Sequence, residues 1–356
     1  MKEFAINHND AGQRLDRFVS KTAPALSASL TQKYIRIKRI KVGNKGSKRD
    51  YILREGDFVQ MYINDEFFAD RPRNPTNDNT SPVAKSDSQT QKNLTSTPLD
   101  IIYEDNNILI VNKKAGVLCH SGNSNSSVTL INQIQSYLIG KNEWDAEKEH
   151  SFSPALCNRI DRNTSGLVIA AKNAAALRII NEKIRLREID KYYLAAVNGI
   201  PDPPAARLEG YLIKDTAKNI SLITQTPLPQ SKPAVTDYKT IKTADNMALL
   251  ECRLITGRSH QIRAQFADIG HPLLGDRKYG GIKDDKAKRG ETSEISTARN
   301  HGTNRNRPNN RQYQSLCAYK ITFAFKSDAG PLAYLSGKTF EITSQNLPDS
   351  VLLREH

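Results

Sequence analysis

The chain has 356 residues, and its 52 Lys and Arg against 38 Asp and Glu give a formal net charge of +14. A hydrophobic content of 38% excludes a wholly disordered chain, and the length predicts two domains. No apolar run approaches the roughly 18 residues of a membrane span, and the first residues lack the apolar core of a signal peptide. We therefore expect a basic protein of the cytoplasm, without a membrane partner.

The cysteines and histidines give no pattern of a metal or redox site. The four cysteines lie far apart and form no C-x-x-C pair, and the seven histidines form no H-E-x-x-H pattern. These spacings favour reduced, mostly buried thiols. We expect no metal site.

Positive charge is concentrated near the N-terminus. Residues 31–49 carry eight Lys or Arg and no acidic residue, a run that repels itself unless a polyanion is bound. Apolar residues at helical spacing predict helices over about residues 12–22 and 27–38, the second with Ser27 as its N-cap. Short strands at residues 40–42 and within 55–62 complete a compact module.

This module resembles the S4 RNA-binding domain, a small module of the αL type. The resemblance is carried by A-G-Q-R-L-D at residues 11–16 and R-I-K-V at residues 39–42. It implies an RNA-binding domain over residues 1–66, whereas a basic surface without a ligand is the alternative. The candidate RNA contacts are Lys33, Arg36, Lys38, Arg39, Lys41 and Lys45.

One polar stretch precedes the second predicted domain, and another lies within it. Residues 67–98 are predicted to be a flexible linker that lets the N-terminal module search for RNA, because residues 70–98 hold no aromatic and only two large apolar residues. Residues 283–311 carry eight Lys or Arg against four acidic residues and predict a basic surface insertion. This insertion is either a disordered loop with incidental charge or an arm that contacts RNA.

Between residues 99 and 350 short strands outnumber helices. Helices are predicted only over residues 174–187 and 260–268. Because no βαβ alternation is present, the predicted class is α+β with a mixed, largely antiparallel sheet. The clearest strands are predicted at residues 101–103, 108–111, 166–171, 192–197, 248–254 and 316–323.

The first segment whose residues could take part in catalysis has a carboxylate between two arginines. Asp161 lies between Arg159 and Arg162 in a polar turn before a buried strand, and opposite charges favour its ionised form. An ionised carboxylate suits a nucleophile or a charge stabiliser better than a general acid. On these residues alone, a structural Arg–Asp pair that ties the turn is the favoured interpretation.

Two further segments place polar side chains near strand ends. Arg258 falls in the connection between a strand that ends at Gly257 and a helix that Ser259 can cap, so its long side chain can reach a site. Tyr192 and Tyr193 face opposite sides of one strand, so at most one of them enters a given site. Core packing is the alternative for either tyrosine.

The order of these segments closely resembles the pseudouridine synthases of the RluA type. The family motif H-R-L-D-x-x-T-S-G-L appears at residues 158–167 with Asn158 and Ile160 in place of His and Leu, and G-R-[ST]-H-Q-I-R begins the segment 257–280. Lys191 and Tyr193 supply the K-x-Y motif. The two departures spare the aspartate, although the hydrogen bonding behind its turn is expected to differ.

The resemblance implies the pseudouridine synthase fold and isomerisation of uridine to pseudouridine within RNA, without a cofactor or a metal. The N1–C1′ bond breaks, the uracil rotates, and C5 bonds to C1′. Asp161 is then the catalytic carboxylate, either as nucleophile at C1′ or as base at C2′. Tyr193 stacks on the uracil and takes part in removing the C5 proton, Arg258 pairs with Asp161, and Arg159 fills the space of the flipped uridine.

Long members with an S4 module, such as the RluC group that acts on large-subunit ribosomal RNA, are the nearest match. Large-subunit ribosomal RNA is therefore the expected substrate, and transfer RNA is the alternative within the enzyme class. A non-catalytic RNA-binding or ribosome assembly factor is the rival class, and the set Asp161, Tyr193 and Arg258 argues against it. We expect a monomer.

Overall fold

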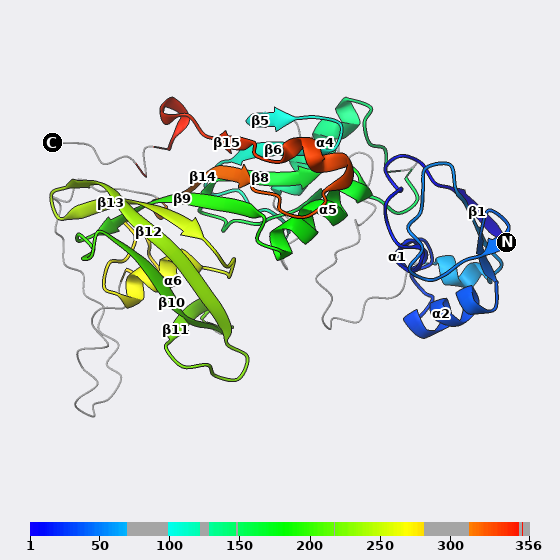
Figure 1. Cartoon of the computed structure of the whole chain (residues 1–356), viewed down its shortest axis with the longest axis horizontal. Coiled ribbons are helices and arrows are strands. Elements are labelled where there is room, and N and C mark those ends of the chain that lie inside the picture. Colours follow the sequence, from blue (N-terminus) through cyan, green and yellow to red (C-terminus); the bar gives the residue numbers. More distant parts are fainter. Residues whose placement is uncertain are drawn as a thin grey trace.

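A computed structural model describes residues 1–69, 99–121, 128–146, 149–216, 218–280, 313–348 and 351. These residues form two folded parts, each built around its own sheet (Figure 1). Most of the expected linker and the whole basic insertion lie outside the described residues. Within the described ranges, no helix has the length and apolar character needed to span a membrane.

The N-terminal module contains two helices beside a four-stranded antiparallel sheet of order β1-β4-β2-β3. The second helix begins where the sequence predicts, because the Ser27 side chain accepts a hydrogen bond from the Leu30 backbone N–H. The elements are β1 (Lys2–Ala5), α1 (Leu15–Thr22), α2 (Ala28–Arg36), β2 (Ile40–Val42), β3 (Lys45–Gly46), β4 (Phe58–Met61) and the short 3₁₀ helix η1 (Asp65–Phe68).

The second part is built on an eleven-stranded sheet. Its main order is β11-β10-β12-β13-β9-β14-β8-β6-β5, with β15 on β14 and β7 on β8. The strands are β5 (Ile101–Glu104), β6 (Ile108–Lys113), β7 (Ala155–Leu156), β8 (Ser165–Ala171), β9 (Ile189–Asn198), β10 (Ala205–Asp215), β11 (Ile220–Thr224), β12 (Lys232–Ala244), β13 (Met247–Leu254), β14 (Leu316–Phe323) and β15 (Thr339–Glu341).

The sheet is mixed, as predicted, because β14 and β8 run parallel while the other described strand pairs are antiparallel. At the parallel pair, Gly166 has φ +118°, and a Cβ there would lie 2.6 Å from the backbone nitrogen of Ala318. Only glycine permits this approach. The α+β prediction is therefore confirmed.

Among the described residues, three helices accompany this sheet: α4 (Leu130–Gly140), α5 (Ala174–Arg185) and α6 (Gln261–Asp268), with 3₁₀ turns η2 (Gly330–Leu335) and η3 (Ser344–Asn346). Helices α4 and α5 lie near β6 and β8, whereas α6 lies beside the β10–β13 half (Figure 1). Helix α4 is absent from the predictions above. Its signal was available, because its buried Leu130, Ile134 and Leu138 recur every four residues.

The N-terminal module packs directly against the second part. Asp10, which is fully buried, accepts hydrogen bonds from the backbone N–H groups of His150 (3.2 Å), Ser151 (3.1 Å) and Phe152 (2.8 Å). Gln13 donates to the Ser151 hydroxyl at 2.6 Å. Buried polar groups satisfied in this way define one relative position of the two parts.

A second line of contact joins the module to helix α5. Arg178 donates to the carbonyl of Gly12 at 3.0 Å, and a Cβ on Gly12 would lie 2.6 Å from that of Ala175. The expectation that the module searches for RNA on a flexible tether is therefore wrong for this structure. The module is held in place because its loop at residues 10–13 packs against α5 and residues 150–152.

Candidate active site

Asp161 lies in the turn that leads into β8, and its side chain is 25% exposed. The turn is closed by a hydrogen bond from the Thr164 N–H to the Asp161 carbonyl at 3.1 Å. The carboxylate oxygen Oδ2 accepts from Nη1 of Arg263 at 3.0 Å and lies 3.8 Å from Nε2 of His260. Among the described residues no hydrogen bond to Oδ1 is found, so this oxygen is available to another partner.

Arg263 is held by a second, fully buried carboxylate. Its Nε and Nη2 donate to the two oxygens of Asp276 at 2.7 and 3.0 Å, and its guanidinium lies 5.0 Å from the centre of the Tyr279 ring. A bidentate pair fixes the plane of the guanidinium. The remaining nitrogen, Nη1, is thereby aimed at Asp161.

The predicted pair of Arg258 with Asp161 is not formed. Arg258 is exposed, and its Nε donates to the carbonyl of Pro233 at 3.3 Å. The reason is the start of α6: His260, not Ser259, is the N-cap, with a left-handed φ of 57°. The helix that follows turns Arg263 inward and leaves Arg258 outside.

His260 belongs to this group although it was not among the predicted site residues. Its Nδ1 lies 3.0 Å from the hydroxyl of Tyr279, and its ring meets the Tyr279 ring edge to face. Burial lowers the pKa of His260, and the charge of Asp161 only partly offsets that effect. The imidazole is therefore mainly neutral at neutral pH. Its place in the H-Q-I-R segment was the available signal.

Tyr193 is the inward-facing member of the tyrosine pair, as the strand alternation predicts. On β9 it is 6% exposed and lies within the main core of the sheet, whereas the ring of Tyr192 is covered by Lys320 Nζ at 4.4 Å from its centre. Burial raises the pKa of Tyr193, and the charge of Asp161 adds to this rise. Tyr193 thus faces the same side as Asp161 and stays a neutral phenol.

Lys113 braces the Asp161 turn from behind. Its ammonium is buried and donates to the carbonyls of Lys114 (3.0 Å), Val117 (2.8 Å) and Arg162 (3.0 Å). Burial lowers the pKa of Lys113 to about 8, while the charges of Cys119 and Asp161 act in the opposite direction. A single cation therefore links the residue after Asp161 to the loop after β6.

The two arginines that flank Asp161 point elsewhere. Arg162 donates through Nε to the carbonyl of Gly116 at 3.0 Å, and Arg159 is exposed. The expected stabilisation of the carboxylate thus comes from Arg263. Asn158, which replaces the family histidine, ties the turn to β8, because its carboxamide oxygen accepts from the Ile169 N–H at 2.8 Å.

The candidate RNA contacts of the N-terminal module lie on or beside α2 and β2, and all but the half-buried Lys41 are exposed. Lys33 and Arg36 line a pocket of about 550 Å³ together with Lys48 and Arg49. Arg39 and Lys41 lie over the rings of Tyr34 and Tyr62, and Lys38 and Lys45 flank them in the chain. This basic surface faces solvent on the module.

The remaining candidate groups are unremarkable in chemistry. The four cysteines are free, and three of them, all but Cys157, are buried. Among the described residues, no group of His, Cys, Asp or Glu has an arrangement that could hold a metal ion. The polar centre consists of Asp161, Arg263, His260 and Tyr193.

Comparison with known proteins gives this geometry a context. The family model described as RNA pseudouridylate synthase matches residues 107–268, a range that contains all four of these residues. A protein of Mycoplasma capricolum named as an uncharacterized RNA pseudouridine synthase is 30% identical over 343 residues, which cover 95% of this chain and 96% of that protein.

A protein of Haemophilus ducreyi named ribosomal large subunit pseudouridine synthase C is 29% identical over 78% of this chain and 79% of its own length. Among solved structures, human RNA pseudouridylate synthase domain containing 4 superposes with a TM-score of 0.50 at 19% identity, over 72% of this chain and 91% of that chain. That structure shares the fold. Taken with the full-length relative, these matches show that the chain belongs to the RNA pseudouridine synthase family and is an isomerase of uridine in RNA.

Proposed function

We propose that this enzyme converts specific uridines of large-subunit ribosomal RNA to pseudouridine, with Asp161 as its catalytic carboxylate. The observation that carries the assignment is the partly exposed carboxylate held through one oxygen by Arg263 at 3.0 Å. A carboxylate that is oriented through one oxygen and leaves the other oxygen available suits attack on the ribose. The relative named for the ribosomal large subunit supports the choice of RNA.

In the proposed reaction the N1–C1′ bond of uridine breaks and a C5–C1′ bond forms. The proton on C5 is lost, and N1 gains a proton, so the product is an isomer. Asp161 acts on the ribose, either as nucleophile at C1′ or as base at C2′. Arg263 fixes the direction of the carboxylate through the charge-assisted hydrogen bond that it donates to Oδ2.

Tyr193 supplies a ring against which the uracil stacks. Because burial raises its pKa, Tyr193 is a poor base at neutral pH, and we assign to it stacking and not removal of the C5 proton. Arg159 and Arg162 are exposed beside the turn and are candidates to contact RNA around the flipped nucleotide. Arg258 is likewise a candidate for contact with RNA, at a distance from the carboxylate.

The N-terminal module is proposed to be an S4-like RNA-binding domain over residues 1–66. Its basic pocket around Lys33 and Arg36 provides several cations for phosphate groups. We propose a monomer that acts in the cytoplasm. Transfer RNA is the second candidate substrate, since a stem-loop of either RNA presents its bases in the same manner.

The test is the substitution Asp161→Asn, which keeps the shape of the side chain and removes its charge. A strain that lacks the gene is complemented with wild-type or variant protein, and pseudouridine is mapped at base resolution in ribosomal and transfer RNA. We expect the variant to leave the target uridine unmodified. Asp237→Asn is the matched control, because Asp237 also pairs with an arginine, Arg207 at 2.6 Å, away from the site.

Full modification by Asp161→Asn would reject the catalytic assignment. Modification confined to transfer RNA would replace the proposed substrate with the second candidate. If the strain complemented with wild-type protein has normal ribosomes but no pseudouridine at any mapped site, the result would favour the non-catalytic assembly factor.

A further inference from the structure

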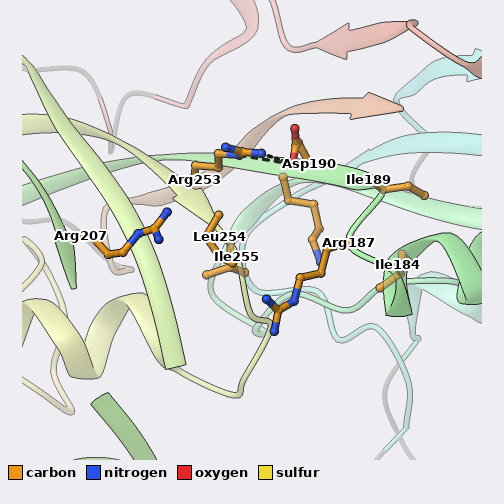
Figure 2. A pocket seen from close by; sticks show the side chains of 9 residues that line it. Ile184, Arg187, Ile189, Asp190, Arg207, Arg253, Leu254 and Ile255 are labelled. Carbon is orange, nitrogen blue, oxygen red and sulfur yellow. Dashed lines mark hydrogen bonds and ion pairs between the residues drawn. The ribbon is translucent and has the colours of Figure 1, made fainter. Parts of the chain in front are cut away.

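A basic surface pocket lies where the end of α5 meets the start of β9 and the end of β13. Its volume is about 230 Å³, which is room for several water molecules at about 30 Å³ each. Four of its lining residues are cationic and one is acidic. They are Arg187, Lys191, Arg207, Arg253 and Asp190, and apolar side chains including Ile184, Leu254 and Ile255 complete the wall (Figure 2).

Two of the four cations are already paired. Arg253 donates to Asp190 at 2.9 Å, the contact drawn as a dashed line in Figure 2, and Arg207 pairs with Asp237 at 2.6 Å. No hydrogen bond or ion pair of the Arg187 or Lys191 side chains is found in the described part of the chain. The pocket therefore presents two cations to which no acceptor is hydrogen-bonded within the described residues.

Lys191 is the more informative of the two. It is partly buried, and burial lowers the pKa of its ammonium, with only partial compensation from the charge of Asp190. A desolvated cation without a bonded acceptor is costly, and a bound anion removes that cost. Lys191 also lies two residues before Tyr193 on β9, so both side chains point to the same face of the sheet.

The end of Lys191 reaches the segment that leads to the catalytic helix. A Cβ placed on Gly257 would lie 3.8 Å from the Lys191 ammonium. Gly257 begins the connection that continues to His260 and Arg263, the residues beside Asp161. Through Gly257, the pocket adjoins the segment that leads to the candidate active site. On its other side the pocket is open at Arg187, which is exposed.

We propose that this pocket binds a backbone phosphate of the RNA close to the target uridine, through Lys191 and Arg187. The inference rests on the proposed function for the identity of the RNA. Every nucleotide of a bound RNA strand carries a phosphodiester anion that could enter this pocket. A phosphate contact positions the strand without reading its sequence. Arg187 meets the phosphate from solvent, and Lys191 meets it from the side of Tyr193.

The experiment measures how RNA binding depends on salt. Full-length wild-type protein, Arg187→Asn and Lys191→Met are titrated with an unmodified transcript of large-subunit ribosomal RNA at several KCl concentrations. Asparagine is chosen because Arg187 has a left-handed φ of 60°, a conformation that asparagine tolerates. Arg185→Gln is the control, since Arg185 is exposed at the end of α5, two residues before Arg187, pairs with Glu182 at 3.7 Å and does not line the pocket.

Each lost phosphate contact lowers the slope of log affinity against log salt by roughly 0.7 to 0.9. We expect that decrease in Arg187→Asn and in Lys191→Met, with restoration by Lys191→Arg and no change in Arg185→Gln. In turnover assays Arg187→Asn raises KM several-fold and leaves kcat near the wild-type value, which a general loss of folding would not do.

Wild-type salt slopes and KM values in both variants would overturn the inference, as would an equal decrease in Arg185→Gln. Failure of the proposed function gives a different result, because wild-type protein would then form no pseudouridine while the salt slopes still report on the pocket. Loss of binding in Lys191→Arg equal to that in Lys191→Met would also contradict a phosphate contact.

Discussion

The contact between the two folded parts and the candidate active site each centre on an aspartate, and the two carboxylates have opposite surroundings. Asp10 is fully buried, and three backbone N–H groups of residues 150–152 donate to it. Asp161 is 25% exposed, and one side chain, that of Arg263, donates to one of its oxygens. A carboxylate whose hydrogen-bonding capacity is filled by backbone groups serves structure, whereas one with an oxygen left over can react.

The comparison also separates two kinds of support. Asp10 is held by backbone groups, so its position depends on the fold of the chain. Asp161 is held through a series of side chains, because Asp276 fixes Arg263 and Arg263 fixes Asp161. Substitutions at the site can therefore change activity with limited effect on the arrangement of the two parts, and substitutions at the contact can do the reverse.

The largest effect is expected for Arg263→Gln, with Arg258→Gln as its matched control. Loss of a charge-assisted hydrogen bond costs about 1.5–3 kcal/mol, and 1.36 kcal/mol is tenfold in rate, so kcat should fall roughly 100-fold. The Arg258 guanidinium donates to the Pro233 carbonyl and not to Asp161 in the described part of the chain, so its substitution should change KM more than kcat. Both constants are measured by tritium release from RNA labelled at C5 of uridine.

Removal of Arg263 also leaves the buried Asp276 without its partner, which destabilises the fold. Circular dichroism at the assay temperature separates loss of folding from loss of orientation, and Arg263→Lys provides a variant that keeps a cation beside Asp276. If Arg258→Gln lost as much kcat as Arg263→Gln, the assignment of Arg263 as the orienting arginine would be wrong.

The choice between these two arginines shows where sequence reasoning stopped. The G-R-S-H-Q-I-R segment carries both, and the identity of the partner of Asp161 depends on where α6 begins. A serine before a helix favours Ser259 as N-cap, but the left-handed His260 starts the helix instead, so Arg263 turns inward. Backbone conformation at one residue, which composition does not encode, decides the contact.

Local patterns predicted other elements well. Strand alternation predicted that Tyr192 and Tyr193 face opposite sides of β9, and the N-cap of α2 at Ser27 was found because capping is a local interaction. The contact of Asp10 with residues 150–152 had no such signal, since it joins segments about 140 positions apart in the chain. Pairings at that distance are set by the packing of whole domains.

Asp10→Ala is predicted to act on the contact and not on the chemistry. It removes the acceptor of three backbone N–H groups, of which that of Phe152 is buried. An unsatisfied buried group costs about 1–3 kcal/mol where water cannot replace the carboxylate. The N-terminal module should then detach, and small-angle X-ray scattering should show an increased radius of gyration. We expect KM for RNA to rise while kcat at saturating RNA stays within about twofold.

Asp16→Ala is the control for that measurement. Asp16 lies on the same module and pairs with Arg14 at 2.6 Å, without contact to the second part. Scattering from this variant should match wild type. A wild-type radius of gyration for Asp10→Ala would show that the contacts of Gly12 and Gln13 hold the module without Asp10.

The smallest effect is expected at Lys113, which supports the Asp161 turn without touching the carboxylate by hydrogen bond. As pH rises through about 8, the Lys113 ammonium loses a proton. The neutral amine has fewer N–H groups to donate to the three carbonyls. The wild-type kcat should therefore fall above about pH 8. Lys113→Met should lower kcat about tenfold at pH 7, equivalent to about 1.4 kcal/mol, and should lack this alkaline limb.

The contribution of Lys113 to the free energy of unfolding should rise over the pH range in which kcat falls. These opposite changes would identify Lys113 as the group that titrates. Because the folded pKa of about 8 lies below the unfolded value of 10.5, the unfolded chain binds more protons between these two pH values. The contribution of Lys113 to the free energy of unfolding therefore increases from pH 8 to 10.5 in the wild type and is absent in Lys113→Met. Denaturant titrations at pH 7 and 9.5 measure this difference, and an alkaline limb of kcat that persists in Lys113→Met would assign the titration to another group.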